Sequence, residues 1–154
     1  MQKLFEGNLE NMSVPSFARS ENKLEAIAST IKMATYTIQM CENEKIFPKK
    51  CRWTLCTKII DTCYDAVARI RQANKIFVKT QEDALLRREL QSKVILDFEA
   101  LYGFMTIAYE LYSIPGEKVD TWAGLILDAE NKVSAWRRKD NERNMQKLDN
   151  INNI

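Results

Sequence analysis

The sequence has no histidine and very few residues that break helices. Four glycines and three prolines among 154 residues are too few to supply the turns of a many-stranded sheet. Without histidine the chain lacks the commonest general base near neutral pH, and no glycine-rich phosphate loop or nucleophile elbow replaces it. We therefore expect a protein built of long helices that is not an enzyme and needs no cofactor.

Long apolar runs are absent as well. No stretch approaches the roughly 18 apolar residues of a membrane-spanning helix, and residues 1–6 are not followed by the apolar segment of a signal peptide. We expect a soluble cytoplasmic protein with no membrane partner.

The cysteines form no ligand pattern. The spacings of Cys41, Cys51, Cys56 and Cys63 match no zinc site, and there is no histidine to complete a mixed one. Cys56 and Cys63 fall on an apolar stripe, which favours buried free thiols; a disulfide or a metal role is the alternative. We predict no metal site.

Hydrophobic periodicity predicts four helices. Apolar residues recur at steps of three and four over 24–41, 56–70 and 86–111. These stripes predict a first helix from near Ser20 that ends before Phe47-Pro48, a second from about Thr54 to Lys75, and a third that opens at Thr80. A heptad pattern then covers residues 119–136. Four helices with short corners imply an all-α, up-down-up-down antiparallel four-helix bundle.

The same pattern divides the chain into three parts. Residues 1–20 carry no sustained period and form an N-terminal extension, residues 21–140 form the bundle, and residues 141–154 form a polar C-terminal tail. Within the bundle, Thr80 and Asp83 have the spacing of a capping box at the start of the third helix.

Two features of the predicted core need separate treatment. Trp122 and Trp136 fall in the heptad seam of the fourth helix, so we expect them in the core. The third stripe, from Leu86 to Leu111, has one polar member, Asp97. A hydrogen-bonded polar group or a subunit contact explains this carboxylate better than a carboxylate enzyme in the bundle interior, for which no histidine is available.

Charge is strongly segregated along the chain. The net charge is only +2, yet residues 45–93 hold twelve basic and five acidic side chains, whereas residues 94–136 hold two basic and seven acidic ones. In an antiparallel bundle, the end of the second helix, the start of the third and the end of the fourth lie at one pole. Nine basic residues should gather there and bind nucleic acid or another polyanion: Arg69, Arg71, Lys75, Lys79, Arg87, Arg88, Arg137, Arg138 and Lys139.

A basic pole with no partner is the alternative. Cations near a helix C-terminus complement the helix dipole, which accounts for Lys75 and residues 137–139. It does not account for Arg87 and Arg88, near the start of the third helix, where the dipole disfavours cations. We therefore favour nucleic-acid binding.

A corner motif joins the first two helices. Pro48 lacks an amide donor and pushes the preceding residue out of the helical region, so the first helix must end before it. A basic and aromatic segment follows, and the motif comprises Phe47, Pro48, Lys49, Arg52, Trp53, Thr54 and Leu55.

This motif, continued through Ile59-Ile60-Asp61 to Ala73-Asn74, resembles the accessory variability determinant (Avd) family of diversity-generating retroelements. The family that it resembles belongs to the wider group of four-helix bundle proteins encoded in intervening sequences of bacterial 23S ribosomal RNA genes. The resemblance covers about residues 22–140 and includes the last helix, which closes with Trp136. Residues 65–74 contain no proline or glycine, which favours the accessory proteins over the intervening-sequence relatives.

The resemblance implies a non-enzymatic accessory protein, bacterial or phage-encoded. Such proteins assemble as a homopentameric barrel, bind a reverse transcriptase and its template RNA, and support mutagenic cDNA synthesis and retrohoming. The alternative is a structural, oligomeric four-helix bundle of the intervening-sequence type, with protein partners only.

Overall fold

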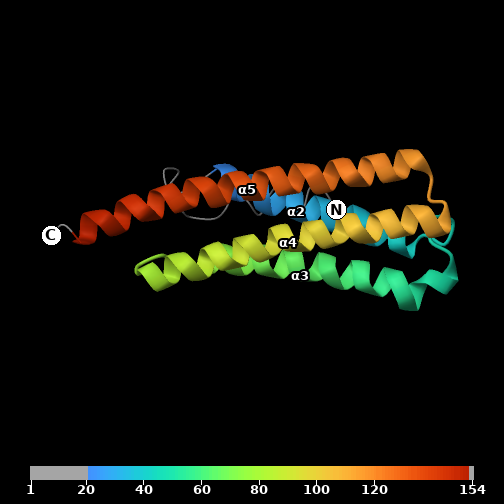
Figure 1. Cartoon of the computed structure of the whole chain (residues 1–154), viewed down its shortest axis with the longest axis horizontal. Coiled ribbons are helices and arrows are strands. Elements are labelled where there is room, and N and C mark those ends of the chain that lie inside the picture. The colour runs from blue at the N-terminus through green and yellow to red at the C-terminus, as the bar shows by residue number, and fades with distance from the viewer. Residues whose placement is uncertain (1–20, 153–154) are drawn as a thin grey trace, which may run out of the picture.

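The computed structural model describes residues 21–152, and these are almost entirely helical (Figure 1). The long helices are α2 (Glu21–Glu42), α3 (Thr57–Lys75), α4 (Gln81–Tyr112) and α5 (Gly116–Asn152). The predicted N-terminal extension at 1–20 lies outside the described residues. No strand occurs in the described part, and none of its helices has the length and apolar character needed to cross a membrane.

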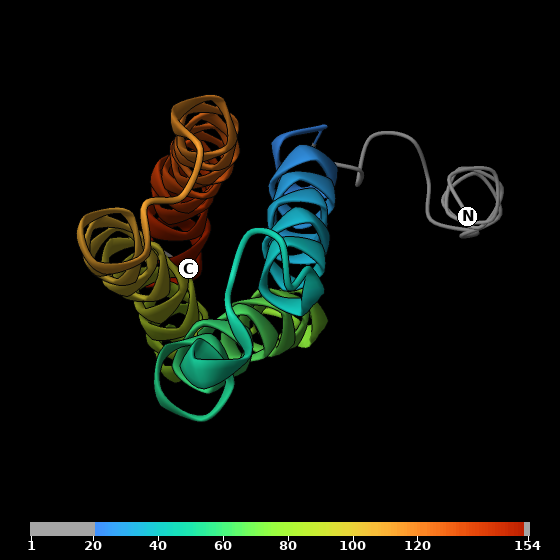
Figure 2. The same ribbon diagram turned by 90° about the vertical axis from the view of Figure 1, so that its right-hand side faces the viewer.

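The helices pack as a four-helix bundle. Successive helices run in opposite directions (Figure 1), and the view along the bundle shows one helix at each of four corners (Figure 2). Contacts join α2 to α3, α3 to α4, α4 to α5, and α5 back to α2. The predicted all-α, up-down-up-down bundle is therefore confirmed. Assembly into a homopentameric barrel stays a prediction.

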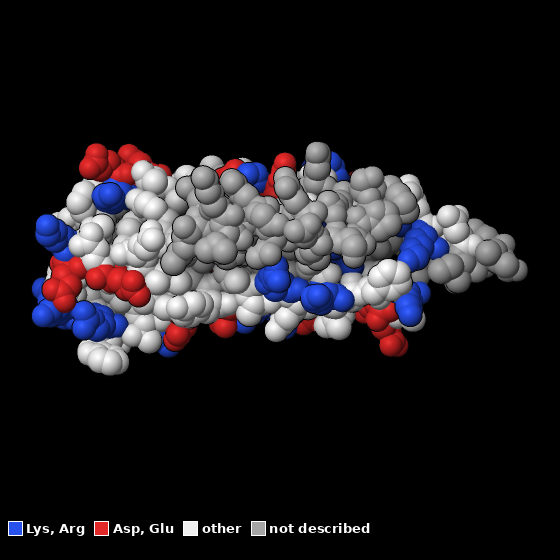
Figure 3. Space-filling view, turned by 180° about the vertical axis from the view of Figure 1, so that it is seen from behind, with Lys and Arg blue, Asp and Glu red and all other residues white. Residues whose placement is uncertain are grey.

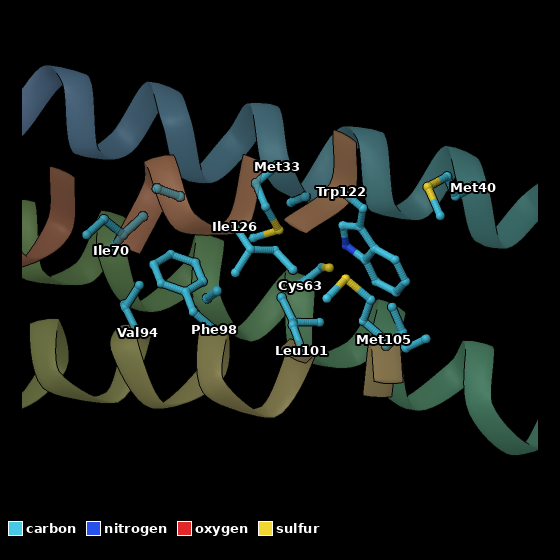
Figure 4. Packing of buried hydrophobic residues seen from close by; sticks show 14 of the residues in the cluster. Met33, Met40, Cys63, Ile70, Val94, Phe98, Leu101, Met105, Trp122 and Ile126 are labelled. Atoms are coloured by element: carbon cyan, nitrogen blue, oxygen red, sulfur yellow. The ribbon is translucent and has the colours of Figure 1, made fainter. Parts of the chain in front are cut away.

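The apolar stripes of the four helices meet in one core (Figure 4). In α5 the heptad residues from Trp122 to Trp136 are buried as predicted, whereas Val119 is only partly buried. Trp122 and Trp136 are among the largest fully buried side chains. The other helices contribute side chains that point into the same interior, among them Met33 of α2, Cys63 and Ile70 of α3, and Phe98 and Leu101 of α4.

The predicted stripe of α4 is correct in its middle and wrong at its ends. Val94 and Leu101 are buried, whereas Leu86 is 50% exposed and Leu111 is 67% exposed. At about 100° per residue, both leucines lie roughly 100° around the helix from the centre of its buried face. The buried face includes Phe98, which the steps of three and four did not select.

The corner between α2 and α3 ends one helix and reshapes the start of the next. The α2 helix ends at Glu42, and Phe47 packs edge-on against Trp122 with the ring centroids 6.5 Å apart. After Pro48 the chain makes a 3-10 turn (Lys49–Cys51) and a π-helical turn (Arg52–Cys56) before regular α-helix begins at Thr57. Regular helix therefore starts three residues later than the predicted Thr54.

The predicted capping box of the third helix is confirmed. The amide of Asp83 donates to the Thr80 hydroxyl at 3.1 Å, and the amide of Thr80 donates to the Asp83 carboxylate at 3.0 Å. At the other end of α4, Ser113 adopts a left-handed conformation with φ 51°. This reversal ends the helix before Pro115.

The segment that we expected to leave the bundle as a polar tail is helical as far as Asn152. Two of its side chains are tied to the folded bundle. Asn144 is buried and donates to Asp140 of the same helix at 3.4 Å, and the Lys147 ammonium donates to the carbonyl of Val78, in the loop before α4, at 2.8 Å. The loop between α3 and α4 thereby holds the last turns of α5.

Candidate nucleic-acid interface

Alternating helix directions bring the predicted basic residues to one end of the bundle, which we call the basic pole (Figure 1). Here the last turns of α3, the loop at 76–80, the first turns of α4 and the second half of α5 meet. Contacts between these segments are direct, since Arg87 of α4 reaches Asp140 of α5 and Lys147 of α5 reaches the loop. The nine candidates do not, however, share one environment.

Arg69 is held by a carboxylate inside the bundle. Its Nη1 atom lies 2.5 Å and 2.6 Å from the two oxygens of Asp97, and Nη2 lies 3.8 Å from Asp65. Burial raises the pKa of the Asp97 carboxyl, and the Arg69 guanidinium opposes that rise. The polar member of the α4 stripe is therefore the hydrogen-bonded group that we expected. Because Asp97 neutralises it, the Arg69 guanidinium offers little charge to an external polyanion.

Arg87 is also used inside the bundle. Its Nη1 atom lies 2.7 Å from Asp140, whose side chain is 2% exposed, and its Nη2 donates to the carbonyl of Ile76. Gln91 and Asn144 donate to the same carboxylate at 3.5 Å and 3.4 Å. A structural role thus accounts for Arg87. Of the two arginines near the start of α4 whose position favoured nucleic-acid binding, only Arg88 still supports it.

The remaining candidates are mostly exposed. Arg137 is half-buried and donates to the Ser92 hydroxyl at 3.1 Å. Six side chains are exposed and make no ion pair among residues 21–152: Arg71, Lys75, Lys79, Arg88, Arg138 and Lys139.

An aromatic side chain that we did not predict lies among these cations. Phe77, in the loop between α3 and α4, is 71% exposed. The Lys79 and Lys147 ammonium groups lie 5.6 Å and 5.4 Å from the centroid of its ring. Both ammonium groups lie over this ring. A nucleic-acid base that stacks on the ring would displace an ammonium from its face, and the freed cation could meet a phosphate. The only signal in the sequence was a phenylalanine in a short loop with a lysine two residues away on each side.

Lys23 at the start of α2 is a further basic residue that the sequence reasoning missed. Burial lowers the pKa of its ammonium, as do the positive charges of Arg87, Arg143 and Lys75, while Asp140 opposes them. All four helices therefore contribute cations to the basic pole. The predicted antiparallel topology could have placed Lys23 at the basic pole, because the start of the first helix lies at the same end as the start of the third.

The corner motif lies at the opposite end of the bundle and divides into buried and exposed parts. Phe47 and Leu55 are buried, whereas Trp53 is 84% exposed. Lys49 and Arg52 both pair with Glu44, at 3.6 Å and 3.4 Å. Lys and Arg side chains are visible near both ends of the face drawn in Figure 3, so the basic pole is not the only basic surface.

The carboxylates and thiols of the described residues form no second site. No group of three or more Cys, Asp or Glu side chains among residues 21–152 could hold a metal ion. All four cysteines are free. Cys56 and Cys63 are buried as their apolar stripe predicted, Cys51 is buried as well, and Cys41 is partly buried. The basic pole remains the strongest candidate site.

Comparisons with protein-family models, with curated proteins and with solved structures gave no match to this chain.

Proposed function

We propose that this protein is a non-enzymatic accessory protein of a diversity-generating retroelement. It binds template RNA through the basic pole and acts together with a reverse transcriptase in mutagenic cDNA synthesis and retrohoming. The resemblance of the corner motif and last helix supports the assignment to a retroelement. The basic pole supports RNA as the ligand.

One observation carries the RNA proposal. Phe77 is exposed between Lys79 and Lys147, at the end of the bundle where the six exposed cations converge. Stacking on an aromatic ring is worth about 1–3 kcal/mol per base. A cation that neutralises a phosphate releases a counterion, so affinity should fall with salt. Together these features suit a single-stranded segment or a loop of RNA.

The test measures binding of a single-stranded RNA oligonucleotide and of an RNA hairpin at two salt concentrations. We expect affinity to fall as salt rises. Phe77→Ala should weaken binding of the single strand about fivefold or more, since one stacked base is lost. A triple charge reversal at Arg71, Arg88 and Lys139 should weaken it further and flatten the salt dependence.

A matched control reverses three exposed lysines at the other end of the bundle: Lys45, Lys58 and Lys118. This variant has the same net charge as the pole variant, so a difference between them reports where RNA binds. Equal loss in both variants, or no binding of wild type at low salt, contradicts the assignment of RNA to the basic pole.

The retroelement assignment has its own test. A reverse-transcriptase gene and a pair of template and variable repeats should lie beside this gene. The encoded reverse transcriptase should co-purify with the protein, and retrohoming should be lost when this gene is deleted. We include the homopentamer implied by the resemblance in the proposal, and light scattering measures it.

The second candidate is a structural, oligomeric bundle with protein partners only. The observation that favours it is the number of large apolar side chains left exposed, such as Trp53 at 84%, Leu96 at 65% and Tyr64 at 59%. Exposed apolar surface of this kind is typical of protein interfaces. An assembly that binds no RNA at low salt supports this candidate.

A further inference from the structure

The outer face of α4 carries a stripe of apolar and small side chains that the rest of the described bundle leaves exposed. Leu96 is 65% exposed and Ile107 is 46% exposed, and Ala100 and Gly103 between them are exposed too. The stripe lies opposite the buried face, because Gly103 is about 180° around the helix from Val94.

Gly103 has no reason to be glycine within its own chain. Glycine in a helix interior is less favourable than alanine because it loses more freedom on folding. A Cβ built at Gly103 meets no atom within 4 Å, and the residue adopts ordinary helical backbone. A second helix that approaches from outside needs a small residue at this position.

The stripe has the same spacing when it is read from either end. Its residues follow one another at steps of three, four, three, four and three, with a cation at one end and an anion at the other. In order they are Lys93, Leu96, Ala100, Gly103, Ile107 and Glu110.

We propose that α4 of a second copy of this chain docks antiparallel on this stripe. With the two helices centred on each other, Leu96 faces Ile107 of the second copy, and Ala100 faces Gly103. The large side chains then flank a centre of small residues where the backbones approach closely. The two-fold axis repeats every contact, so a single stripe supplies both sides of the interface.

The opposite charges at the two ends of the stripe indicate a second copy of this chain as the occupant and an antiparallel orientation of its α4. Within its own helix the Lys93 ammonium lies 2.9 Å from Glu89. In the antiparallel arrangement it also faces Glu110 of the second copy, whereas a parallel arrangement would place lysine against lysine. Asp97 lies beside the stripe, but Arg69 binds its carboxylate at 2.5 Å. It therefore adds no unpaired acid to the contact.

This pairing goes beyond the proposed homopentamer and does not rest on it. A ring joins two different faces of each chain, whereas the α4 contact uses one face twice. It also sets the two basic poles at opposite ends of the pair, because the start of one α4 lies beside the end of the other.

The test measures mass by light scattering and sedimentation over a concentration series. Wild type should contain the α4 pair. If the homopentamer also forms, pairing through α4 joins two rings, and the measured mass distinguishes this double ring from a single ring. Ile107→Glu should weaken the association at least about tenfold, since it places a charge in the contact. Gly103→Leu should also weaken it, while the folded chain tolerates the change because its Cβ meets open space.

Two further variants make the test specific. Leu127→Glu on α5, where the leucine is 52% exposed, is the matched control and should leave the association unchanged. Lys93→Glu and Glu110→Lys should each weaken the pairing about three- to tenfold, and the double reversal should restore it. A monomeric wild type, an assembly that Ile107→Glu leaves intact, or a double reversal without rescue overturns the proposal.

Discussion

Arg87 of α4 and Asp140 of α5 form an ion pair inside the basic pole, with Nη1 2.7 Å from the carboxylate oxygen. Asp140 also accepts from Gln91 and Asn144, and is 2% exposed. This pair joins the start of one helix to the second half of another. It uses one cation of the basic pole inside the bundle and so removes that cation from the surface that we assign to RNA.

The first prediction concerns this pair. Asp140→Ala should lower the free energy of unfolding by about 3 kcal/mol, because it leaves the Arg87 guanidinium buried without its carboxylate. The double variant Arg87→Met with Asp140→Leu should recover part of this loss because neither charge remains, and the rest should persist because Gln91 and Asn144 still lack their acceptor. Denaturant unfolding measures both.

The neighbouring arginine is the control for that experiment. Arg88 is exposed, so Arg88→Met should change stability by no more than about 0.5 kcal/mol. A destabilisation by Arg88→Met as large as that of Asp140→Ala would contradict a specific structural role for the buried pair.

The second prediction separates the two aromatic residues of the corner motif. Phe47 is 2% exposed and packs on Trp122, so Phe47→Ala should lower the free energy of unfolding by about 3–5 kcal/mol. Trp53 is 84% exposed, and Trp53→Ala should cost about 0.5 kcal/mol or less. Thermal and denaturant unfolding measure both variants. Equal destabilisation by Phe47→Ala and Trp53→Ala would refute the assignment of Phe47 to the core and Trp53 to the surface.

The third prediction concerns pH. Hydrogen bonds from the backbone amides of Lys79 and Thr80 hold the pKa of the Asp83 carboxyl below its ordinary value of 3.8. A carboxyl with a lowered folded-state pKa stabilises the fold above its unfolded pKa, and this contribution is lost as the pH falls through the folded-state value. From pH 6 down to pH 2, the free energy of unfolding of wild type should therefore include a decrease that Asp83→Asn does not show.

Glu82→Gln serves as the comparison, because it changes a charge in the same turn of α4 without touching the capping box. It should keep the acid-side loss that Asp83 produces. If Asp83→Asn and wild type lose stability in parallel over this range, the cap contributes nothing that depends on pH.

The fourth prediction concerns the thiols. Burial raises the pKa of the Cys63 thiol to about 12, and a hydrogen bond with Thr37 partly offsets the rise. Burial and the neighbouring Cys56 also raise the pKa of Cys41. Since the thiolate is the reactive species, Cys63 should react at pH 8 about a thousandfold more slowly in the folded protein than in denaturant. Mass spectrometry after timed alkylation measures this, and fast labelling of Cys63 in the folded state would contradict its burial.

Local patterns predicted the elements well. The heptad of α5 placed Trp122 and Trp136 in the core, and the spacing of Thr80 and Asp83 predicted the capping box, because each depends on residues close in sequence. The ends of the α4 stripe were misjudged, since Leu86 and Leu111 continue the period but lie to the side of the buried face. Periodicity alone does not show where the neighbouring helices leave a flank uncovered.

The candidate site was predicted in part for a related reason. The sequence determined the number and order of the helices. In an antiparallel bundle this order is enough to bring cations from distant segments to the basic pole. Only the tertiary structure decided which of these cations stay exposed. Asp97 and Asp140 are distant in sequence from Arg69 and Arg87, so no spacing rule pairs them. The exposure of Phe77 between Lys79 and Lys147 likewise depends on where α5 passes the loop. An ion pair or a cation–aromatic contact needs side chains within a few ångströms, and packing sets that distance.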